Sequence, residues 1–144
     1  MPTQTATSGE QVVRRIYDEC VNAGHTDRLG EMVSDDFVGP QGERGPTGFA
    51  QTIAMLRAGF PDIRFTVEAV VADGDDVAVR WTWHGTHTGT FRAWAPTGKA
   101  VTDTGMAFYR LERGRVVRAW VETNRLGVLQ QIGAVPADLG APRR

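Results

Sequence analysis

Residues 63–84 read IRFTVEAVVADGDDVAVRWTWH, and this stretch decides the class of fold. Two runs rich in valine, threonine and aromatic residues, 63–72 and 76–84, flank the triplet Asp73, Gly74 and Asp75. Branched and aromatic residues favour strands, and an Asp-Gly pair between two such runs favours a tight turn. The stretch therefore predicts an antiparallel hairpin.

The second half of the chain carries the same kind of pattern. Segments 101–111 and 115–124 predict two further strands joined by a turn at residues 112–114, and segment 88–93 predicts a shorter strand. Segment 126–132 predicts a final helical turn. We expect these strands to form an antiparallel sheet.

Helical spacing dominates the residues before Pro61. Ser8 and Gln11 form a capping-box pattern at the start of a first amphipathic helix. A second, short helix is expected over residues 26–36, and a third over residues 47–60, where Pro61 forbids continuation. Helices followed by a run of strands predict the α+β class.

Composition limits the organisation and the partners of the chain. Its 144 residues, 41% of them hydrophobic, suffice for one domain, with an ordered core over about residues 8–135. The 16 basic and 17 acidic residues form no block of one sign, so we expect neither nucleic acid nor a membrane as partner. The single cysteine, Cys20, and the polar residues 1–8 favour a cytoplasmic protein.

Two tryptophans mark one face of the strand at residues 76–84. Strand alternation places Trp81 and Trp83 on the same side as Val77 and Val79. Both rings could fill a core, or they could line a pocket for a flat or polyene ligand. The pattern of this strand alone leaves the two interpretations open.

Acidic residues offer the candidate chemistry. Asp103 shares a predicted strand face with the small residues Gly105 and Ala107, and a carboxylate facing a cavity there can act as acid or base. The alternative is that the strand begins later and that Asp103 is a solvated loop residue. Glu122 and Asn124 form a second polar group, and the pattern does not tell which face of their strand is inside.

Several kinds of site are missing from the sequence. It has no phosphate-binding glycine loop, no cysteine or histidine pairs at zinc spacing and no Gly-x-Ser-x-Gly nucleophile elbow. His84 and His87 flank Gly85 and Thr86, which we interpret as a turn with polar tips. We therefore expect no metal and no cofactor.

Four short motifs occur along the chain: Phe60-Pro61-Asp62, Gly85-Thr86-His87-Thr88-Gly89, Pro96-Thr97-Gly98 and Leu129-Gln130-Gln131-Ile132-Gly133. Together they resemble the SnoaL-like polyketide cyclases of the nuclear-transport-factor-two-like superfamily, over roughly residues 10–136. The resemblance implies a cone-shaped α+β barrel, with three N-terminal helices packed on a curved antiparallel or mixed sheet around a deep pocket. It also implies homodimers formed through the sheet and cofactor-independent chemistry on a polyketide-like small molecule.

The catalytic residues of two related groups are not present here. The aspartate and histidine of the aldol cyclases fall, without gaps, on Val121 and Ala107. An arginine and an aspartate of the limonene epoxide hydrolases fall on Trp81 and Trp83, which implies that both rings face the cavity. This exchange of polar groups for apolar surface leads us to expect that folding the substrate chain matters more than proton transfer.

The resemblance predicts a cyclase of antibiotic biosynthesis that closes a ring in a largely apolar linear polyketide. A cycloaddition-type reaction that forms a carbocycle is one form that this ring closure can take. Relatives that form pyran rings imply Tyr17 and Asp103 as the polar pair, and Glu122 completes the catalytic candidates. The candidate substrate-binding residues are Trp81, Trp83, Trp94, Phe37, Met55, Phe60, Ala107, Val121 and Asn124.

Two alternatives remain at this stage. One is an ether-forming cyclase or epoxide hydrolase with Asp103 as acid or base, and the other is a non-catalytic module that binds a hydrophobic intermediate. The loop over residues 92–102 contains Trp94, Pro96 and Gly98, and it is either a lid over the pocket mouth or an ordinary connection.

Overall fold

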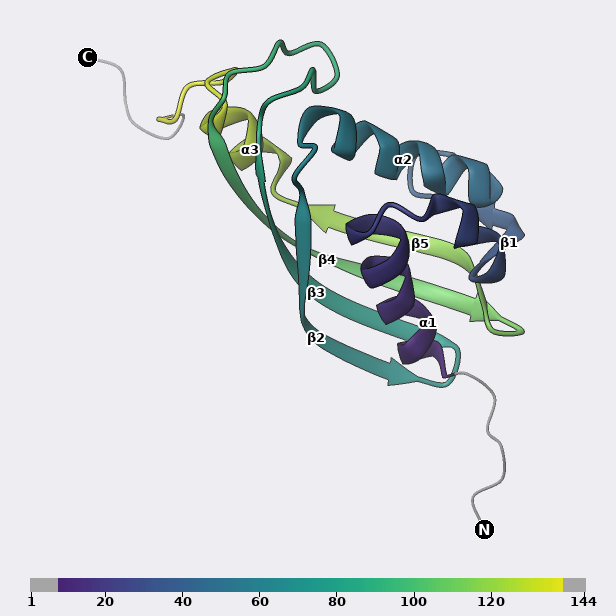
Figure 1. Cartoon of the computed structure of the whole chain (residues 1–144). Coiled ribbons are helices and arrows are strands. Elements are labelled where there is room, and N and C mark those ends of the chain that lie inside the picture. Colours follow the sequence, from purple (N-terminus) through teal and green to yellow (C-terminus); the bar gives the residue numbers. More distant parts are fainter. Residues whose placement is uncertain (1–7, 139–144) are drawn as a thin grey trace.

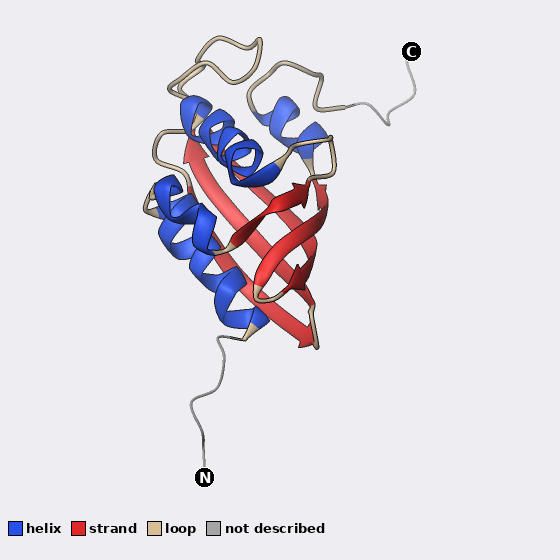
Figure 2. Ribbon diagram, turned by 90° about the vertical axis from the view of Figure 1, so that its right-hand side faces the viewer, coloured by secondary structure: helices blue, strands red, loops and turns tan. Residues whose placement is uncertain are grey.

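The computed structural model describes residues 8–138, in which helices cover one face of a single five-stranded sheet (Figures 1 and 2). The strand order is β1-β5-β4-β3-β2. The elements are α1 (Gly9–Arg15), the π-helix η1 (Ile16–Asn22), the 3-10 helix η2 (Thr26–Glu31), β1 (Val33–Val38), α2 (Gly45–Gly59), β2 (Arg64–Asp73), β3 (Asp76–Thr86), β4 (Ala100–Glu112), β5 (Arg115–Thr123) and α3 (Arg125–Gln131).

The two predicted hairpins and the three N-terminal helices are confirmed. Ser8 caps α1 as expected, since its hydroxyl accepts from the Gln11 backbone N–H at 3.2 Å and the Gln11 side chain accepts from the Ser8 N–H at 3.0 Å. The third helix, α2, ends at Gly59, just ahead of Pro61. These features depend on short stretches of chain, which is why the sequence predicts them.

The sheet is mixed, whereas the strand pattern alone predicts an antiparallel one. Antiparallel pairing joins β2, β3, β4 and β5, but β1 lies parallel to β5 with Val33 beside Val116. The second helix ends at Glu31 and not near residue 36, because the chain after Met32 joins the free edge of β5. The barrel is open, with β1 and β2 as its edge strands.

The predicted strand over residues 88–93 does not form. Its place in the structure is a loop that carries a single bridge between Phe91 and Trp94. The Gly89 N–H donates to the Gly59 carbonyl at 3.2 Å, so this segment pairs with the end of α2 and not with the sheet. Gly89 therefore lies directly against the C-terminal end of α2.

This approach leads to a test of stability. A methyl group at Gly89 would overlap the Ala58 carbonyl oxygen, so Gly89→Ala should lower the free energy of unfolding by about 1–3 kcal/mol. Gly30→Ala is the matched control, since nothing lies within 4 Å of the added carbon. Denaturant unfolding of both variants measures the difference, and equal stabilities would contradict the packing at Gly89.

The inner face of β3 is buried, as the alternation predicts. Trp81 and Trp83 are 5% and 1% exposed, whereas Arg80 before them and His84 after them are exposed on the opposite face. Helices cover one face of the sheet (Figure 2), and the burial of Trp81 and Trp83 places both rings on that face. We therefore expect the site on this inner face.

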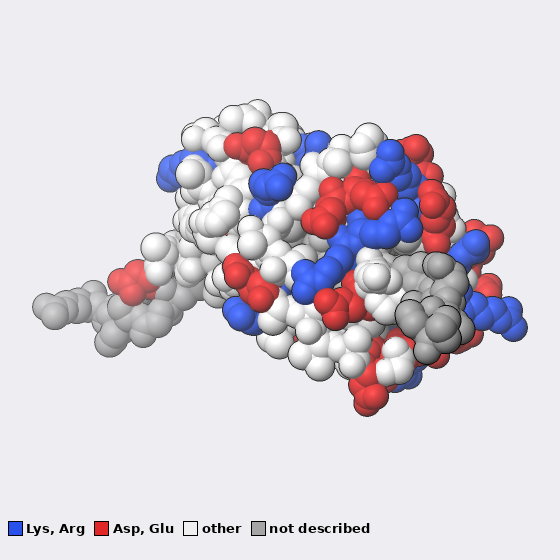
Figure 3. All heavy atoms as spheres, turned by 60° about the horizontal axis from the view of Figure 1, so that its bottom comes forward, with Lys and Arg blue, Asp and Glu red and all other residues white. Residues whose placement is uncertain are grey.

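Charges of both signs intermingle on the face of the molecule that Figure 3 shows. Pairs such as Arg14 with Glu10, 2.9 Å apart, account for part of this mixture. Among the described residues, no helix has the length and apolar character needed to cross a membrane.

Candidate active site

An aromatic cluster fills the end of the interior near α3. The Phe60 ring is its centre, with ring-centroid distances of 4.9 Å to Trp83, 5.4 Å to His87 and 5.3 Å to Phe91. These four side chains are at most 1% exposed. A ligand that enters from the solvent must therefore move at least one of these rings.

Asp103 lies beside this cluster. It pairs in register with Trp83 across β3 and β4, which places both side chains on the inner face. The carboxylate is 2% exposed, its Oδ2 accepts from the Thr123 hydroxyl at 2.7 Å, and its Oδ1 has no hydrogen-bond partner within residues 8–138. Since β4 begins at Ala100, Asp103 is a buried strand residue and not a solvated loop residue.

Arg125 is a polar neighbour that the sequence analysis missed. It is the first residue of α3, and its guanidinium carbon lies 5.2 Å from the centre of the Phe91 ring. Burial lowers the pKa of Arg125, and the negative charge of Asp103 acts in the opposite direction. Arg125 Nη1 is buried and lacks a hydrogen-bond partner among the described residues. Arg125 follows the last predicted strand, where no periodic pattern indicates which side chains point inward, so the sequence did not predict its partial burial.

His87 is not the exposed tip of a turn, as the sequence suggested. It is fully buried, because the inward alternation of β3 continues through Trp83 and Gly85 to His87. Its Nδ1 lies 2.9 Å from the Thr97 hydroxyl and accepts from the Thr97 backbone N–H at 3.3 Å. Its Nε2 has no partner within the described part of the chain.

Tyr17 and Asp103, the predicted polar pair, do not contact each other. The Tyr17 and Tyr109 hydroxyls share a hydrogen bond of 2.7 Å, and Tyr109 is six residues beyond Asp103 on β4, about 20 Å along the strand. The Trp81 ring packs over Gly105, between these two positions, and fills the space that the glycine leaves. Tyr17 thus belongs to a separate part of the interior.

The buried tyrosine pair should be visible in a pH titration. Burial raises the pKa of Tyr109 to about 12 and that of Tyr17 well above its usual range. The tyrosinate absorbance of the native protein should therefore stay flat through about pH 10, where an exposed tyrosine is half ionised. The unfolded chain ionises first, so stability should fall as the pH rises above about 10. A native titration with the midpoint of an exposed tyrosine would contradict the buried pair.

Strand β5 now has an assigned inner face. Val121 lies opposite the buried Ala107 on the inner face but is itself 37% exposed, whereas Glu122 lies opposite the exposed Met106 on the outer face. The structure therefore separates Glu122 from Asp103. Asn124 is exposed and caps α3, where its side-chain oxygen accepts from the Gly127 N–H at 3.0 Å.

The other predicted binding residues line the interior at different depths. Phe37 is 2% exposed and contacts Phe49 at a centroid distance of 5.4 Å, while Met55 on α2 is half-buried. Trp94 is half-buried and stacks on Phe91 at 6.3 Å. Trp94 thus connects the loop after β3 to the aromatic cluster.

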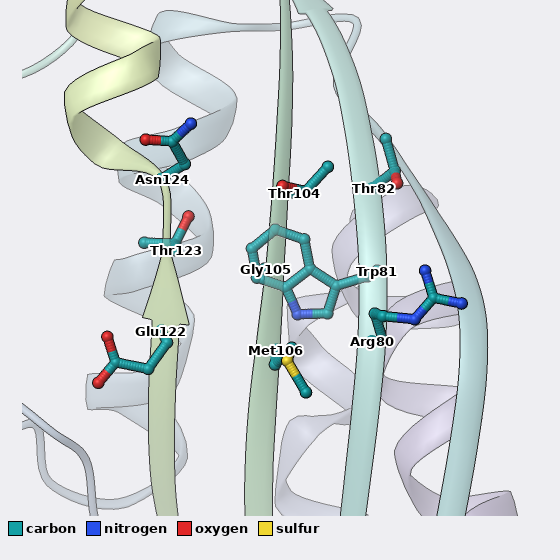
Figure 4. A pocket seen from close by; sticks show the side chains of 9 residues that line it. All are labelled: Arg80, Trp81, Thr82, Thr104, Gly105, Met106, Glu122, Thr123 and Asn124. Atoms are coloured by element: carbon teal, nitrogen blue, oxygen red, sulfur yellow. The ribbon is translucent and has the colours of Figure 1, made fainter.

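A hollow of about 570 Å³ lies elsewhere, on the sheet around Gly105 (Figure 4). Outer-face residues form part of its lining: Arg80, Thr82, Thr104, Met106 and Glu122. Trp81, Gly105, Thr123 and Asn124 line it as well. The predicted pocket on the inner face is filled by aromatic side chains in this structure. Among residues 8–138, no three His, Cys, Asp or Glu side chains are grouped as metal ligands would be.

Comparison with known proteins agrees with this architecture. Similar solved structures include a proposed SnoaL-like polyketide cyclase from Jannaschia sp. CCS1, with 26% identity, a TM-score of 0.82 and coverage of 94% of this chain and 100% of that chain. IdmH, a proposed polyketide cyclase from Streptomyces antibioticus, has 28% identity, a TM-score of 0.74 and coverage of 88% and 99%. TsrD from Streptomyces laurentii, at 22% identity, shares the fold with a TM-score of 0.82 and coverage of 92% and 100%.

No curated protein sequence matches the chain at a significant level. The family model of SnoaL-like polyketide cyclases, however, matches residues 11–132, which include every helix and strand from η1 to α3. The chain therefore belongs to the SnoaL-like polyketide cyclase family.

Proposed function

We propose that this protein closes a ring in a largely apolar linear polyketide without a cofactor, as a step of antibiotic biosynthesis. The observation that carries the proposal is a buried carboxylate, Asp103, with one unpaired oxygen among the described residues. It is the cross-strand neighbour of Trp83, whose ring contacts Phe60. Family membership and the two proposed cyclases above 25% identity support the reaction class.

The two kinds of side chain have different tasks in this proposal. The aromatic rings of Trp83 and Phe60 hold the substrate chain in a folded conformer, which removes part of the entropic barrier to ring closure. Asp103 Oδ1 takes a proton from the substrate and returns it to the product, while Thr123 holds Oδ2 in place. Tyr17 is not required, since its hydroxyl is already paired with Tyr109.

The experiment is a ring-closure assay with a linear polyene ketone. Wild-type protein should accelerate formation of the cyclic isomer over buffer, as followed by mass spectrometry and chromatography, and added chelator should not change the rate. Tight binding of the linear compound without any acceleration would favour a carrier of hydrophobic intermediates and would contradict the proposed cyclase.

We also propose that two copies pair through the outer face of the sheet. Met106, Phe108 and Trp120 are 57%, 38% and 48% exposed on the neighbouring strands β4 and β5, which forms an apolar patch. Phe108 and Trp120 meet edge-on at a centroid distance of 5.7 Å, so the patch is already ordered in one chain. Burial of such a patch favours association.

Light scattering measures this pairing. The wild-type protein should have twice the chain mass of 15.7 kDa, and Trp120→Lys should have the mass of one chain. Val71→Lys is the control, because Val71 is 69% exposed on the edge strand β2, outside the patch. A monomeric wild-type protein would exclude the dimer.

A further inference from the structure

Two deeply buried polar groups near the aromatic cluster have no partner in the described part of the chain. They are Nε2 of His87, in a side chain with 0% exposure, and Oδ1 of Asp103, in a side chain with 2% exposure. A buried polar atom without a hydrogen bond is costly, so a folded protein normally pairs it with something. Half-buried Arg125 adds a third such atom, Nη1.

Ring contacts connect the three groups. The Phe60 ring contacts both His87 and Trp83, and Trp83 is the direct cross-strand neighbour of Asp103. Phe91 contacts Phe60 at 5.3 Å and lies under the Arg125 guanidinium at 5.2 Å. The three residues that carry the unpaired atoms therefore lie around one aromatic cluster.

Two groups of Thr97 lie beside His87 Nδ1: the hydroxyl at 2.9 Å, which can donate or accept, and the backbone N–H at 3.3 Å, which also donates to the His87 carbonyl. Nδ1 accepts from the Thr97 backbone N–H, and a backbone N–H can only donate. A neutral imidazole that accepts at Nδ1 carries its proton on Nε2. We assign His87 this tautomer, in which the unpaired Nε2 is an N–H donor. Two bonds from Thr97 and Gly98 to the His87 carbonyl, at 3.1 and 2.8 Å, hold the residue in place.

We infer that His87, Arg125 and Asp103 form a binding site for the oxygenated end of the substrate. Two donors, the His87 N–H and the Arg125 guanidinium, suit a carbonyl oxygen, and the Asp103 oxygen suits a neighbouring hydroxyl. A group with a carbonyl acceptor next to a hydroxyl donor is an enolised 1,3-diketone or a β-hydroxyketone. Aromatic or polyene carbon on either side of it would contact Phe60, Phe91 and Trp83.

The inference that the carbonyl and the neighbouring hydroxyl belong to a substrate rests on the proposed function. Binding of such a group at His87, Arg125 and Asp103 can still be tested without turnover. The probe is dibenzoylmethane, an enolised diketone between two phenyl rings, and 1,3-diphenylpropane is the same skeleton without the oxygens. Calorimetry should show saturable binding of dibenzoylmethane to the wild-type protein, and His87→Asn should weaken it about 10-fold. Asparagine can still accept from Thr97 through its side-chain oxygen, but it has no donor at the Nε2 position.

Two variants separate the lost donor from a general effect of substitution. His84→Asn alters a histidine on the outer face whose Nδ1 lies 3.0 Å from the Thr102 hydroxyl, and it should bind the probe like the wild type. His87→Gln restores a donor near the Nε2 position and should recover part of the affinity. Binding of 1,3-diphenylpropane should be the same in all of these proteins.

Nitrogen NMR of the wild-type protein gives a measurement that does not depend on how the variants fold. The free protein should show the His87 proton on Nε2, and dibenzoylmethane should shift that signal while 1,3-diphenylpropane should not. Absence of probe binding, an unshifted His87 signal at saturation, or equal losses for His84→Asn and His87→Asn would each overturn the site. If dibenzoylmethane shifts the His87 signal but the protein closes no ring, the binding site is supported and the proposed cyclase activity is contradicted.

Discussion

Asp103→Asn should lower the rate of ring closure by about 100-fold to 10,000-fold, because an amide cannot take up and return a proton at neutral pH. This reverses the expectation from the sequence, because Asp103 is buried with one oxygen unpaired among the described residues. The variant should still fold, since the asparagine oxygen can accept the Thr123 hydrogen bond of 2.7 Å that Oδ2 accepts now. Single-turnover rates with a linear polyene ketone measure the effect, and thermal unfolding checks the fold.

Thr123→Val provides the matched comparison for this prediction. It removes the hydrogen bond to Asp103 Oδ2 but leaves the carboxylate, so the rate should fall about 10-fold or less. A folded Asp103→Asn protein with nearly full activity would show that proton transfer is not limiting. Chain folding by the aromatic surface would then remain, as the sequence alone suggested.

Trp83→Ala should have the largest effect on stability, lowering the free energy of unfolding by about 3–5 kcal/mol. The ring is 1% exposed and lies 4.9 Å from Phe60 and 6.3 Å from Phe65, so its removal leaves a large cavity at the centre of the fold. Denaturant unfolding with a constant m-value measures the loss. Activity should fall as well, because the substrate loses a wall of its site.

Trp83→Phe and Trp120→Ala help to interpret that result. Phenylalanine keeps most of the aromatic contact with Phe60, so its cost should be well below that of alanine. Trp120 is 48% exposed, so Trp120→Ala in the same assay should cost less than Trp83→Ala. Equal costs for Trp83→Ala and Trp120→Ala would contradict the central position of Trp83.

Much of the fold could be predicted because its signals are local. The hairpin of β2 and β3, the capping box at Ser8 and the end of α2 before Pro61 each depend on a few consecutive residues. The parallel pairing of β1 with β5 could not be predicted, because it joins Val33 to Val116. No pattern within either segment specifies a partner so far along the chain.

The candidate site was predicted in part. Strand alternation found the shared face of Trp81 and Trp83 and the face that Asp103 shares with Gly105 and Ala107, and the family resemblance paired Asp103 with Tyr17. The buried position of His87 was missed because glycine and threonine before it suggested a turn, whereas the register of β3 continues through them. Tyr17 was linked to Asp103, but the structure pairs Tyr17 with Tyr109.

The sequence by itself determined the α+β class, the family and the inward face of β3, since periodicity and short motifs follow from neighbouring residues. Only the tertiary structure decided which polar groups meet. Asp103, His87 and Arg125 come from β4, the end of β3 and the start of α3, and strand register and helix docking bring them to one aromatic surface. Contacts between distant segments depend on packing of the whole chain, which no local pattern records.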